Sequence, residues 1–157
     1  MRVADVMQKD PVTFRPDQGL AAIEEILVRC GITGAPVVEE GRLVGVISRS
    51  DLVRQLELER SRIESAHETL GSFEREDAFA TPASVAMAVA TRWLPLKVKD
   101  VMRRDVVQVS PDDTVATAAG RMVEHGIHRL AVTDGGHLVG LVSTLDLLAV
   151  LASQPMD

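Results

Sequence analysis

The sequence predicts an α+β fold, in the broad α/β class, built from two copies of one β-α-β-β-α unit. Residues 3–56 align without a gap onto residues 98–151, at a constant offset of 95. About 20 aligned positions are identical, far above chance for this composition. Both copies also carry the same order of strand, helix and turn signals. Neither unit could bury its helix faces alone, so we expect them to pack together with pseudo-two-fold symmetry.

The composition excludes several classes of protein. Of the 157 residues, 46% are hydrophobic and 25% charged, as in ordinary globular proteins. A net charge of −6 argues against a general nucleic-acid binder, which needs clustered Lys and Arg. The single cysteine, Cys30, excludes an internal disulfide, and we expect its thiol to be buried. No segment is apolar enough for a signal peptide or a membrane span, so we expect a cytoplasmic protein.

Each copy opens with a short extended run and a helix. The runs, 12–14 and 107–109, end before Pro16 and Pro111, because proline disfavours helix at the residue before it. Asp17 and Asp112 then stand where an N-cap is wanted. Apolar residues at helical spacing predict one buried face per helix. These residues are Leu20, Ile23, Ile26 and Leu27 in the first copy, and Val115, Ala118, Met122 and Val123 in the second.

A hairpin and a second helix complete each copy. Gly31 and Gly126 end the first helices, since the left-handed C′ position favours glycine. The predicted strands are 35–38 and 43–47 around Glu40-Gly41, and 130–133 and 138–142 around Gly135-Gly136. The second helix begins near Ser48 in one copy and near Ser143 in the other.

A helical connector separates the copies, which gives the predicted division 1–56, 57–97 and 98–157. Residues 57–70 extend the preceding helix, and 71–80 form a loop. Thr81 as N-cap and Pro82 at the first helical position open another helix, which runs to about Trp93. A connector of this length is a spacer on its own domain, a partner contact or a dimerisation element.

The pattern Gly-x-x-Ser-x-x-Asp follows the hairpin in both copies. It places Ser48 and Asp51, and likewise Ser143 and Asp146, on one side of the first helical turn. The carboxylate could accept both hydroxyls of a ribose, and the helix start could bind a phosphate. The same spacing is close to a capping box, which needs no ligand. The leading glycine, which capping does not require, would let a ligand approach the strand.

Taken together, these motifs resemble a pair of cystathionine-β-synthase (CBS) domains, the arrangement called a Bateman module. The resemblance rests on the paired Asp-Val-Met opening, the helix ending in Gly-Ile, the Ala-Pro-Val-Val strand and the repeated Gly-x-x-Ser-x-x-Asp ending. It implies two clefts, in which adenosine-type ligands bind in many relatives. Asp51 and Asp146 would hold ribose hydroxyls, with Ser48 and Ser143 beside the ribose or phosphate. Backbone at Thr13, Ala35, Gln108 and Leu130 would frame the adenine.

Three differences between the copies predict unequal sites. Thr144 replaces Arg49, which removes a positive group near one phosphate position. Arg129 stands opposite Gly34 in the alignment and could supply charge from another side. Ala131 replaces Pro36, where the family favours proline. The predicted ligand-binding residues are therefore Thr13, Ala35, Pro36, Ser48, Arg49, Asp51, Gln108, Arg129, Leu130, Ser143, Thr144 and Asp146.

The expected function is ligand-dependent regulation rather than catalysis. No nucleophile with its base, no phosphate-binding loop and no zinc signature is visible, and no cofactor is required. The ligand would be AMP, ADP, ATP or S-adenosylmethionine, and its binding would change the pose of the repeats allosterically. We expect no separate effector domain, so the output would pass through an unknown partner or a homodimer formed by the helix faces. The alternative is an interaction or dimerisation module that binds no ligand.

Overall fold

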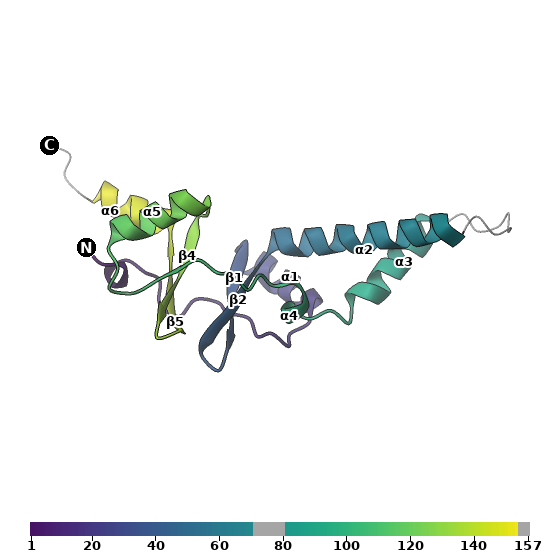
Figure 1. Cartoon of the computed structure of the whole chain (residues 1–157), viewed down its shortest axis with the longest axis horizontal. Helices are drawn as coiled ribbons and strands as arrows, with labels where there is room; N and C mark the ends of the chain where they lie inside the picture. The colour runs from purple at the N-terminus through teal and green to yellow at the C-terminus, as the bar shows by residue number, and fades with distance from the viewer. Residues whose placement is uncertain (71–80, 154–157) are drawn as a thin grey trace. The chain divides into compact units, whose positions relative to one another are not determined.

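A computed structural model of the chain describes residues 1–70 and 81–153 (Figure 1). The chain divides into two compact units, and neither unit coincides with one repeat. The first unit comprises Met1–Thr13, Ala35–Val46 and the chain from Arg103 onward; the second comprises Phe14–Gly34 and Ile47–Met102.

The strands form a five-stranded sheet in the order β1-β2-β5-β4-β3. Their bounds are β1 Gly34–Glu39, β2 Arg42–Ser48, β3 Gln108–Val109, β4 Arg129–Asp134 and β5 His137–Ser143. Each hairpin strand is one residue longer at both ends than predicted. The turn residues Glu40, Gly41, Gly135 and Gly136 all have positive φ, as a tight two-residue hairpin turn requires. The predicted α+β fold class is confirmed.

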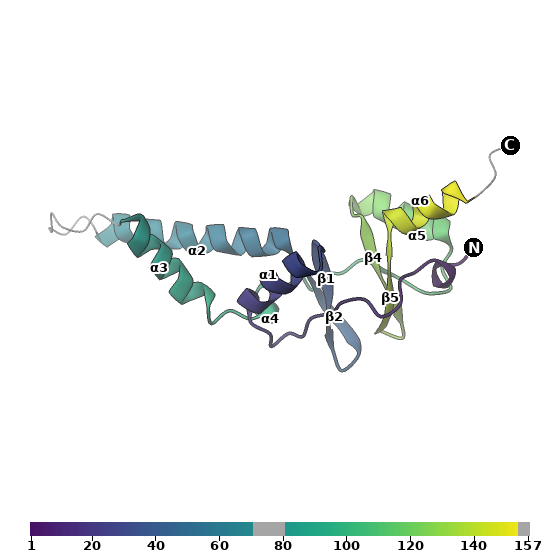
Figure 2. The same ribbon diagram turned by 180° about the vertical axis from the view of Figure 1, so that it is seen from behind.

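Within the first unit, helices α5 (Val115–His125) and α6 (Thr144–Ala152) pack on β4 and β5 (Figure 2). Their buried faces meet strand residues in one core. Its buried members are Val3, Val109, Ala118, Met122, Leu130, Val132, Val142 and Leu147. The prediction for Val123 is wrong, because this side chain is 83% exposed. It follows the buried Met122, and a rotation of about 100° per residue turns it away from the core.

The second unit contains α1 (Leu20–Arg29), α2 (Arg49–Leu70), α3 (Pro82–Trp93) and α4 (Val98–Val101). Leu20, Ile23 and Leu27 of α1 are fully buried, whereas Ile26 is half-buried. The prediction of a buried thiol is wrong, because Cys30 is exposed. It occupies the C-cap of α1, one residue before Gly31, which takes the left-handed conformation at φ 63°.

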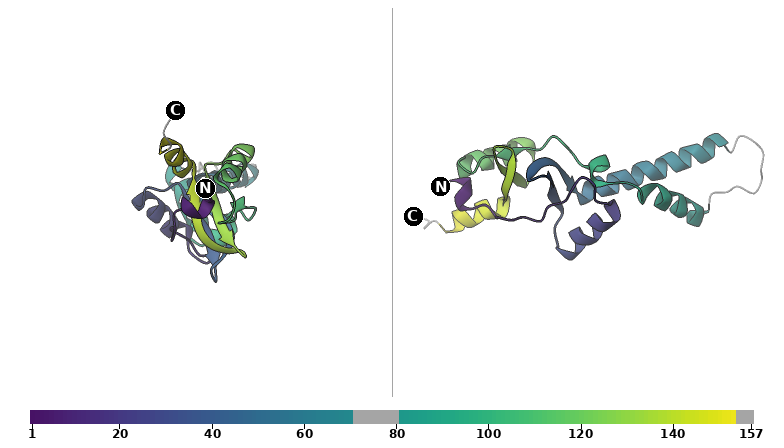
Figure 3. Two further views of the ribbon diagram at one scale, coloured as in Figure 1. Left: turned by 90° about the vertical axis from the view of Figure 1, so that its left-hand side faces the viewer. Right: turned by 90° about the horizontal axis from the view of Figure 1, so that it is seen from below.

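Helices α2 and α3 pack against each other, as the right-hand view in Figure 3 shows. A buried carboxylate, Glu59, joins them. Its Oε1 accepts from Gln55 at 2.9 Å and pairs with Arg62 at 3.0 Å, while Oε2 pairs with Arg92 of α3 at 3.0 Å. The start of α3 agrees with the prediction, since the Thr81 hydroxyl accepts from the Ser84 N–H at 3.1 Å and Pro82 follows. The predicted loop 71–80 lies outside the described residues.

The predicted aspartate N-caps are wrong in both copies, because the chain makes a turn after the proline before the helix begins. Gly19 and Thr114 occupy the N-cap positions, and the Thr114 hydroxyl accepts from the Thr117 N–H at 3.0 Å. Asp17 instead accepts from the Arg15 Nε at 3.2 Å, and this hydrogen bond holds the pKa of its carboxyl below the ordinary value. Asp112 pairs with Arg2 at 2.5 Å.

The first extended run is shorter than predicted. Only Phe14 makes a strand-like bridge in 12–14, whereas β3 occupies two of the three residues in 107–109. The first helix of each copy, its glycine end and the start of the second helix all agree with the prediction.

The opening segment of each repeat packs among elements of the other repeat. In the first unit, Val3 of the 3₁₀ helix η1 (Val3–Asp5) is fully buried in the core of α5, β4 and β5. Gln8 forms a two-way backbone pair with Leu141, at 2.8 and 3.0 Å. In the second unit, the fully buried Val98 donates its N–H to Gln18 at 2.9 Å. Each repeat therefore depends on the opening residues of the other.

Candidate ligand-binding site

In the second repeat, a complete capping box surrounds the predicted ribose-binding residues. Ser143 ends β5 and is the N-cap of α6, and Asp146 lies in the first turn of that helix. The Asp146 Oδ2 accepts from the Ser143 N–H at 2.7 Å and from its hydroxyl at 2.6 Å, while the Asp146 N–H lies 3.3 Å from the hydroxyl oxygen. One carboxylate oxygen is therefore committed to the helix start.

The other oxygen of Asp146 faces the opening segment of the first repeat. The Gln8 Nε2 donates to Oδ1 at 3.4 Å, a long hydrogen bond. The Gln8 side chain is exposed, and Asp146 is half-buried. The second carboxylate oxygen thus has a long hydrogen bond from an exposed amide, which a ligand hydroxyl could replace.

Two other predicted residues lie next to this box, one on β4 and one at the start of α6. Arg129, at the start of β4, is the antiparallel partner of Ser143 and is exposed. The Thr144 N–H donates to the His128 carbonyl at 3.0 Å. Arg129 therefore lies next to the capping box in the sheet, and its role as the charge of a ligand site stays a prediction.

The two residues expected to frame an adenine have different environments. Gln108 in β3 pairs with Ala131, and its Oε1 accepts from the Thr133 hydroxyl at 2.7 Å. Its carbonyl accepts from Arg121, so this backbone acceptor is already engaged. Leu130 is 1% exposed and belongs to the core, so its side chain contributes packing.

The structure gives a reason for the glycine at position 140 that the sequence did not reveal. A Cβ at this position would stand 2.8 Å from the Gln8 carbonyl oxygen and 2.9 Å from the Met7 sulfur. Real Cβ atoms do not approach backbone so closely, so the glycine admits the opening segment of the first repeat. This packing is enough to explain why residue 140 is glycine. That the glycine also lets a ligand approach the strand stays a prediction.

The first repeat contains the same capping box with a more enclosed carboxylate. The Asp51 Oδ2 accepts from the Ser48 N–H at 2.9 Å and its hydroxyl at 2.6 Å. Asp51 is only 3% exposed, and its Oδ1 lies 3.6 Å from the Arg54 guanidinium. Arg49 is exposed at the start of α2.

The other residues predicted for this site belong to the other compact unit. Thr13 is exposed, whereas Ala35 and Pro36 are buried in β1. The structure thus brings together Ser48 and Asp51 here, and Arg129, Ser143, Thr144 and Asp146 in the second repeat. Sequence reasoning missed Gln8, because the alignment assigns it to the first repeat, opposite Arg103.

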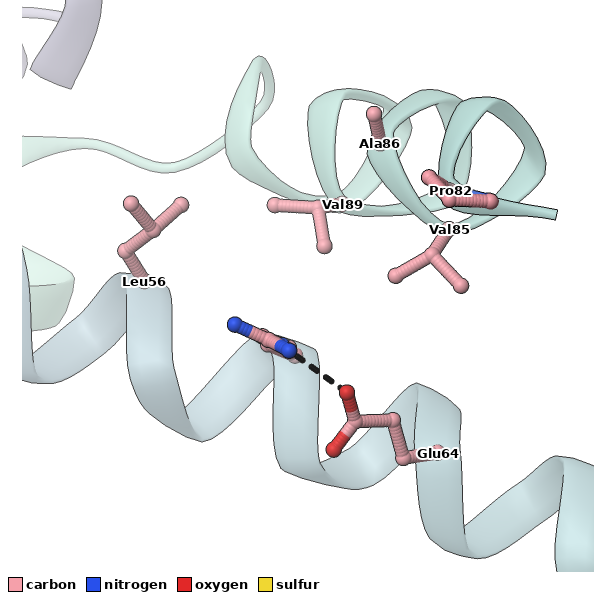
Figure 4. A pocket seen from close by; sticks show the side chains of 7 residues that line it. Leu56, Glu64, Pro82, Val85, Ala86 and Val89 are labelled. Atoms are coloured by element: carbon pink, nitrogen blue, oxygen red, sulfur yellow. Dashed lines mark hydrogen bonds and ion pairs between the residues drawn. The ribbon is translucent and has the colours of Figure 1, made fainter. Parts of the chain in front are cut away.

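Other site types were sought across residues 1–70 and 81–153. Within these ranges no three His, Cys, Asp or Glu side chains gather as metal ligands, and no helix is long and apolar enough to cross a membrane. A groove of about 520 Å³ lies between α2 and α3, where Leu56, Val85 and Val89 point into it (Figure 4). None of the predicted ligand-binding residues lines it.

Comparison with known proteins identifies the family. The model of the CBS domain matches residues 3–58 and 98–153, one match for each repeat. The chain belongs to the CBS domain family. Both matches contain a Ser-x-x-Asp box, which places the two boxes at equivalent positions of two tandem CBS domains.

Relatives extend over nearly the whole CBS domain pair. The uncharacterized protein MJ1426 of Methanocaldococcus jannaschii is 34% identical over 154 residues, which cover 96% of this chain and 91% of that protein. Several other curated relatives are longer, and this chain spans less than half of their length.

Solved structures share the fold at lower identity. CBSX2 in complex with AMP is 21% identical with a TM-score of 0.70, and the alignment covers 97% of this chain and 96% of CBSX2. The CBS domain pair of MJ0100, in complex with 5-methylthioadenosine and S-adenosyl-L-methionine, is 22% identical with a TM-score of 0.65. That alignment covers 99% of this chain and 98% of the MJ0100 domain pair.

Proposed function

We propose that this CBS domain pair is a regulatory module that binds an adenine nucleotide or a related adenosyl compound, and that it acts by binding rather than by catalysis. The environment of Asp146 is the observation that carries the proposal. One carboxylate oxygen is fixed by the capping box, and among the described residues the other accepts only the 3.4 Å hydrogen bond from Gln8. A half-buried carboxylate of fixed orientation is suited to accept the hydroxyls of a ribose.

The surroundings of Asp146 support an adenosyl ligand with at most a modest negative charge. Arg129 beside Ser143 provides a cation, while Thr144 and Gln8 are neutral. AMP in one similar structure, and 5-methylthioadenosine with S-adenosyl-L-methionine in another, show that the shared fold admits such compounds. We therefore expect AMP or an uncharged or cationic adenosyl compound to bind the second repeat more tightly than ATP.

Calorimetric titration and thermal unfolding of ligand-free protein test this proposal. AMP, ADP, ATP, 5-methylthioadenosine and S-adenosylmethionine are compared, with CMP as the control for the base. At a ligand concentration 100 times the dissociation constant, a bound compound should add about 2.7 kcal/mol to the free energy of unfolding. The absence of heat and of stabilisation with every adenosyl compound would contradict the proposal.

Variants of Asp146 separate ligand binding from helix capping. Asp146→Asn keeps a side-chain oxygen for the Ser143 N–H but loses the carboxylate, so we expect at least about tenfold weaker binding from the loss of charge-assisted hydrogen bonds. Asp134→Asn, at the exposed end of β4, is the matched control and should bind as the unmodified chain does.

The complete capping boxes also favour a second candidate, an interaction module without a ligand. On this hypothesis Asp146→Ala lowers only the free energy of unfolding, by the roughly 0.5–2 kcal/mol of a lost cap, and no adenosyl compound stabilises the protein. Mass spectrometry of compounds released from gently purified protein distinguishes the two candidates directly.

A further inference from the structure

The opening segment of the first repeat brings one residue, Gln8, to the capping box of the second repeat. A two-way backbone pair with Leu141 holds it there, with N–O distances of 2.8 and 3.0 Å. Leu141 lies on β5, shortly before Ser143, the residue that begins the box. Because these hydrogen bonds join main-chain groups, they fix the backbone of position 8 without using its side chain.

The Gln8 side chain contacts the carboxylate on which the proposed ligand site depends. Its Nε2 donates to the Asp146 Oδ1 at 3.4 Å. Within the described part of the chain, the Asp146 carboxylate accepts hydrogen bonds only from Gln8 and Ser143, and neither residue is charged. The negative charge of Asp146 therefore faces an uncharged amide at position 8.

The equivalent position of the second repeat carries a cation. Arg103 aligns with Gln8 at the repeat offset of 95, and it makes the same two-way backbone pair, with Val46 of β2, at 2.9 Å in both directions. The fold thus presents positions 8 and 103 on a strand in the same way, while the sequence places an amide at one and a guanidinium at the other. A difference of charge at a fixed position is suited to select ligands by their charge.

We propose that Gln8 determines which ligand charge the second repeat accepts. The inference rests on the proposed function, in which Asp146 holds the hydroxyls of a ribose. A ribose hydroxyl can replace the Gln8 amide on Oδ1 at little cost, because the amide is exposed and water can then hydrogen-bond it. A cation at position 8 would instead form an ion pair with Asp146 and attract phosphate groups. Gln8 therefore favours uncharged and cationic adenosyl compounds over polyphosphates.

Charge variants of Gln8 test the inference through ratios of dissociation constants, measured by calorimetry. Gln8→Arg should weaken the binding of 5-methylthioadenosine, because its ion pair with Asp146 has to break, and should strengthen the binding of ATP. The ratio of the ATP constant to the 5-methylthioadenosine constant should fall by at least about tenfold. Gln8→Glu should raise the ratio of the ATP constant to the S-adenosylmethionine constant by about tenfold, because it repels the anion and attracts the cation.

Two matched controls keep the charge of position 8 at zero. Gln8→Ala removes the side chain without adding a charge, so both ratios should stay within about threefold of their original values. Asp134→Asn, at an exposed position of β4, changes the net charge by the same amount as Gln8→Arg and should leave both ratios unchanged. Because both side chains are exposed, the unfolding midpoints of all four variants should stay within about 2 °C of the original.

The pattern across ligands separates the possible results. A merely structural role of Gln8 would weaken all three compounds alike and leave the ratios unchanged. Unchanged ratios in Gln8→Arg and Gln8→Glu, while the unmodified chain binds and Asp146→Asn weakens binding, would overturn the inference and leave the proposed function intact. An equal change of the ratios in Asp134→Asn would also overturn it. Binding of none of the compounds to the unmodified chain would overturn both.

Discussion

The two repeats carry the same Ser-x-x-Asp box, but the carboxylates differ in what remains available to a ligand. In the first repeat Asp51 is 3% exposed and its Oδ1 lies near the Arg54 guanidinium. In the second repeat Asp146 is half-buried and its Oδ1 accepts a long hydrogen bond from Gln8. The residue aligned with Arg54 is Ala149, so the second box has no arginine one turn along its helix.

This difference shows that one motif can hold a carboxylate in two chemically distinct environments. Capping uses Oδ2 of each aspartate in the same way. The surroundings of the remaining oxygen, Oδ1, depend on residues outside the motif. In the second repeat this neighbour is Gln8, from the opening segment of the first repeat. An identical motif therefore does not imply identical ligand preference.

The largest change in stability is expected in the opening segments, each of which packs among elements of the other repeat. Val3 and Val98 occupy equivalent positions and are both fully buried. Replacement of either by alanine should lower the free energy of unfolding by about 2–3 kcal/mol, from lost burial and the resulting cavity. Val3→Ala should accelerate hydrogen exchange in β4, β5 and α5, whereas Val98→Ala should accelerate it in α1.

Hydrogen exchange followed by mass spectrometry checks this assignment. Val123→Ala is the matched control, because this valine is 83% exposed, and it should change stability by less than about 0.5 kcal/mol. Faster exchange of α1 in Val3→Ala would mean that each opening segment supports its own repeat instead.

The next largest change in stability is expected at the first residue of β1, compared with the first residue of β4. At Gly34 a Cβ would stand 2.8 Å from the Ile47 carbonyl oxygen, so Gly34→Ala should cost about 1–3 kcal/mol through displacement of the backbone. The aligned residue in the second repeat is Arg129, which has room for its side chain. Arg129→Ala should stay within about 0.5 kcal/mol of the original in urea unfolding. Equal costs would show that the two strand ends have the same spacing.

The sequence predicted the elements well, because local signals determine them. The positive-φ turns at Glu40-Gly41 and Gly135-Gly136, the glycine helix ends and the Thr81-Pro82 helix start all rest on residues within a few positions. The family assignment likewise followed from motifs repeated in order, and the match of both repeats confirmed it.

Features that depend on distant residues were predicted less well. Helices α1 and α5 begin after Gly19 and Thr114 rather than after the aspartates. The preference of aspartate for N-cap positions does not tell how many residues the turn after the proline contains. The contact between Gln8 and Asp146 joins residues 138 positions apart, and the alignment of repeats assigns Gln8 elsewhere. Exposure of Cys30 and Val123 depends on the final rotation of their helices.

The smallest expected difference in stability is the one between alanine variants of the two aspartates. Asp51→Ala and Asp146→Ala each remove a cap, which costs roughly 0.5–2 kcal/mol. Asp51 should lie at the upper end, about 2 kcal/mol, because this carboxylate is 3% exposed and its replacement leaves the half-buried Ser48 donors without their acceptor. Asp146 should cost about 1 kcal/mol, because this carboxylate is only half-buried and water can take its place more readily. Urea unfolding of both variants in ligand-free protein measures the difference. Equal costs would indicate equally accessible boxes, and the second site would then lose its claim to be the better ribose acceptor.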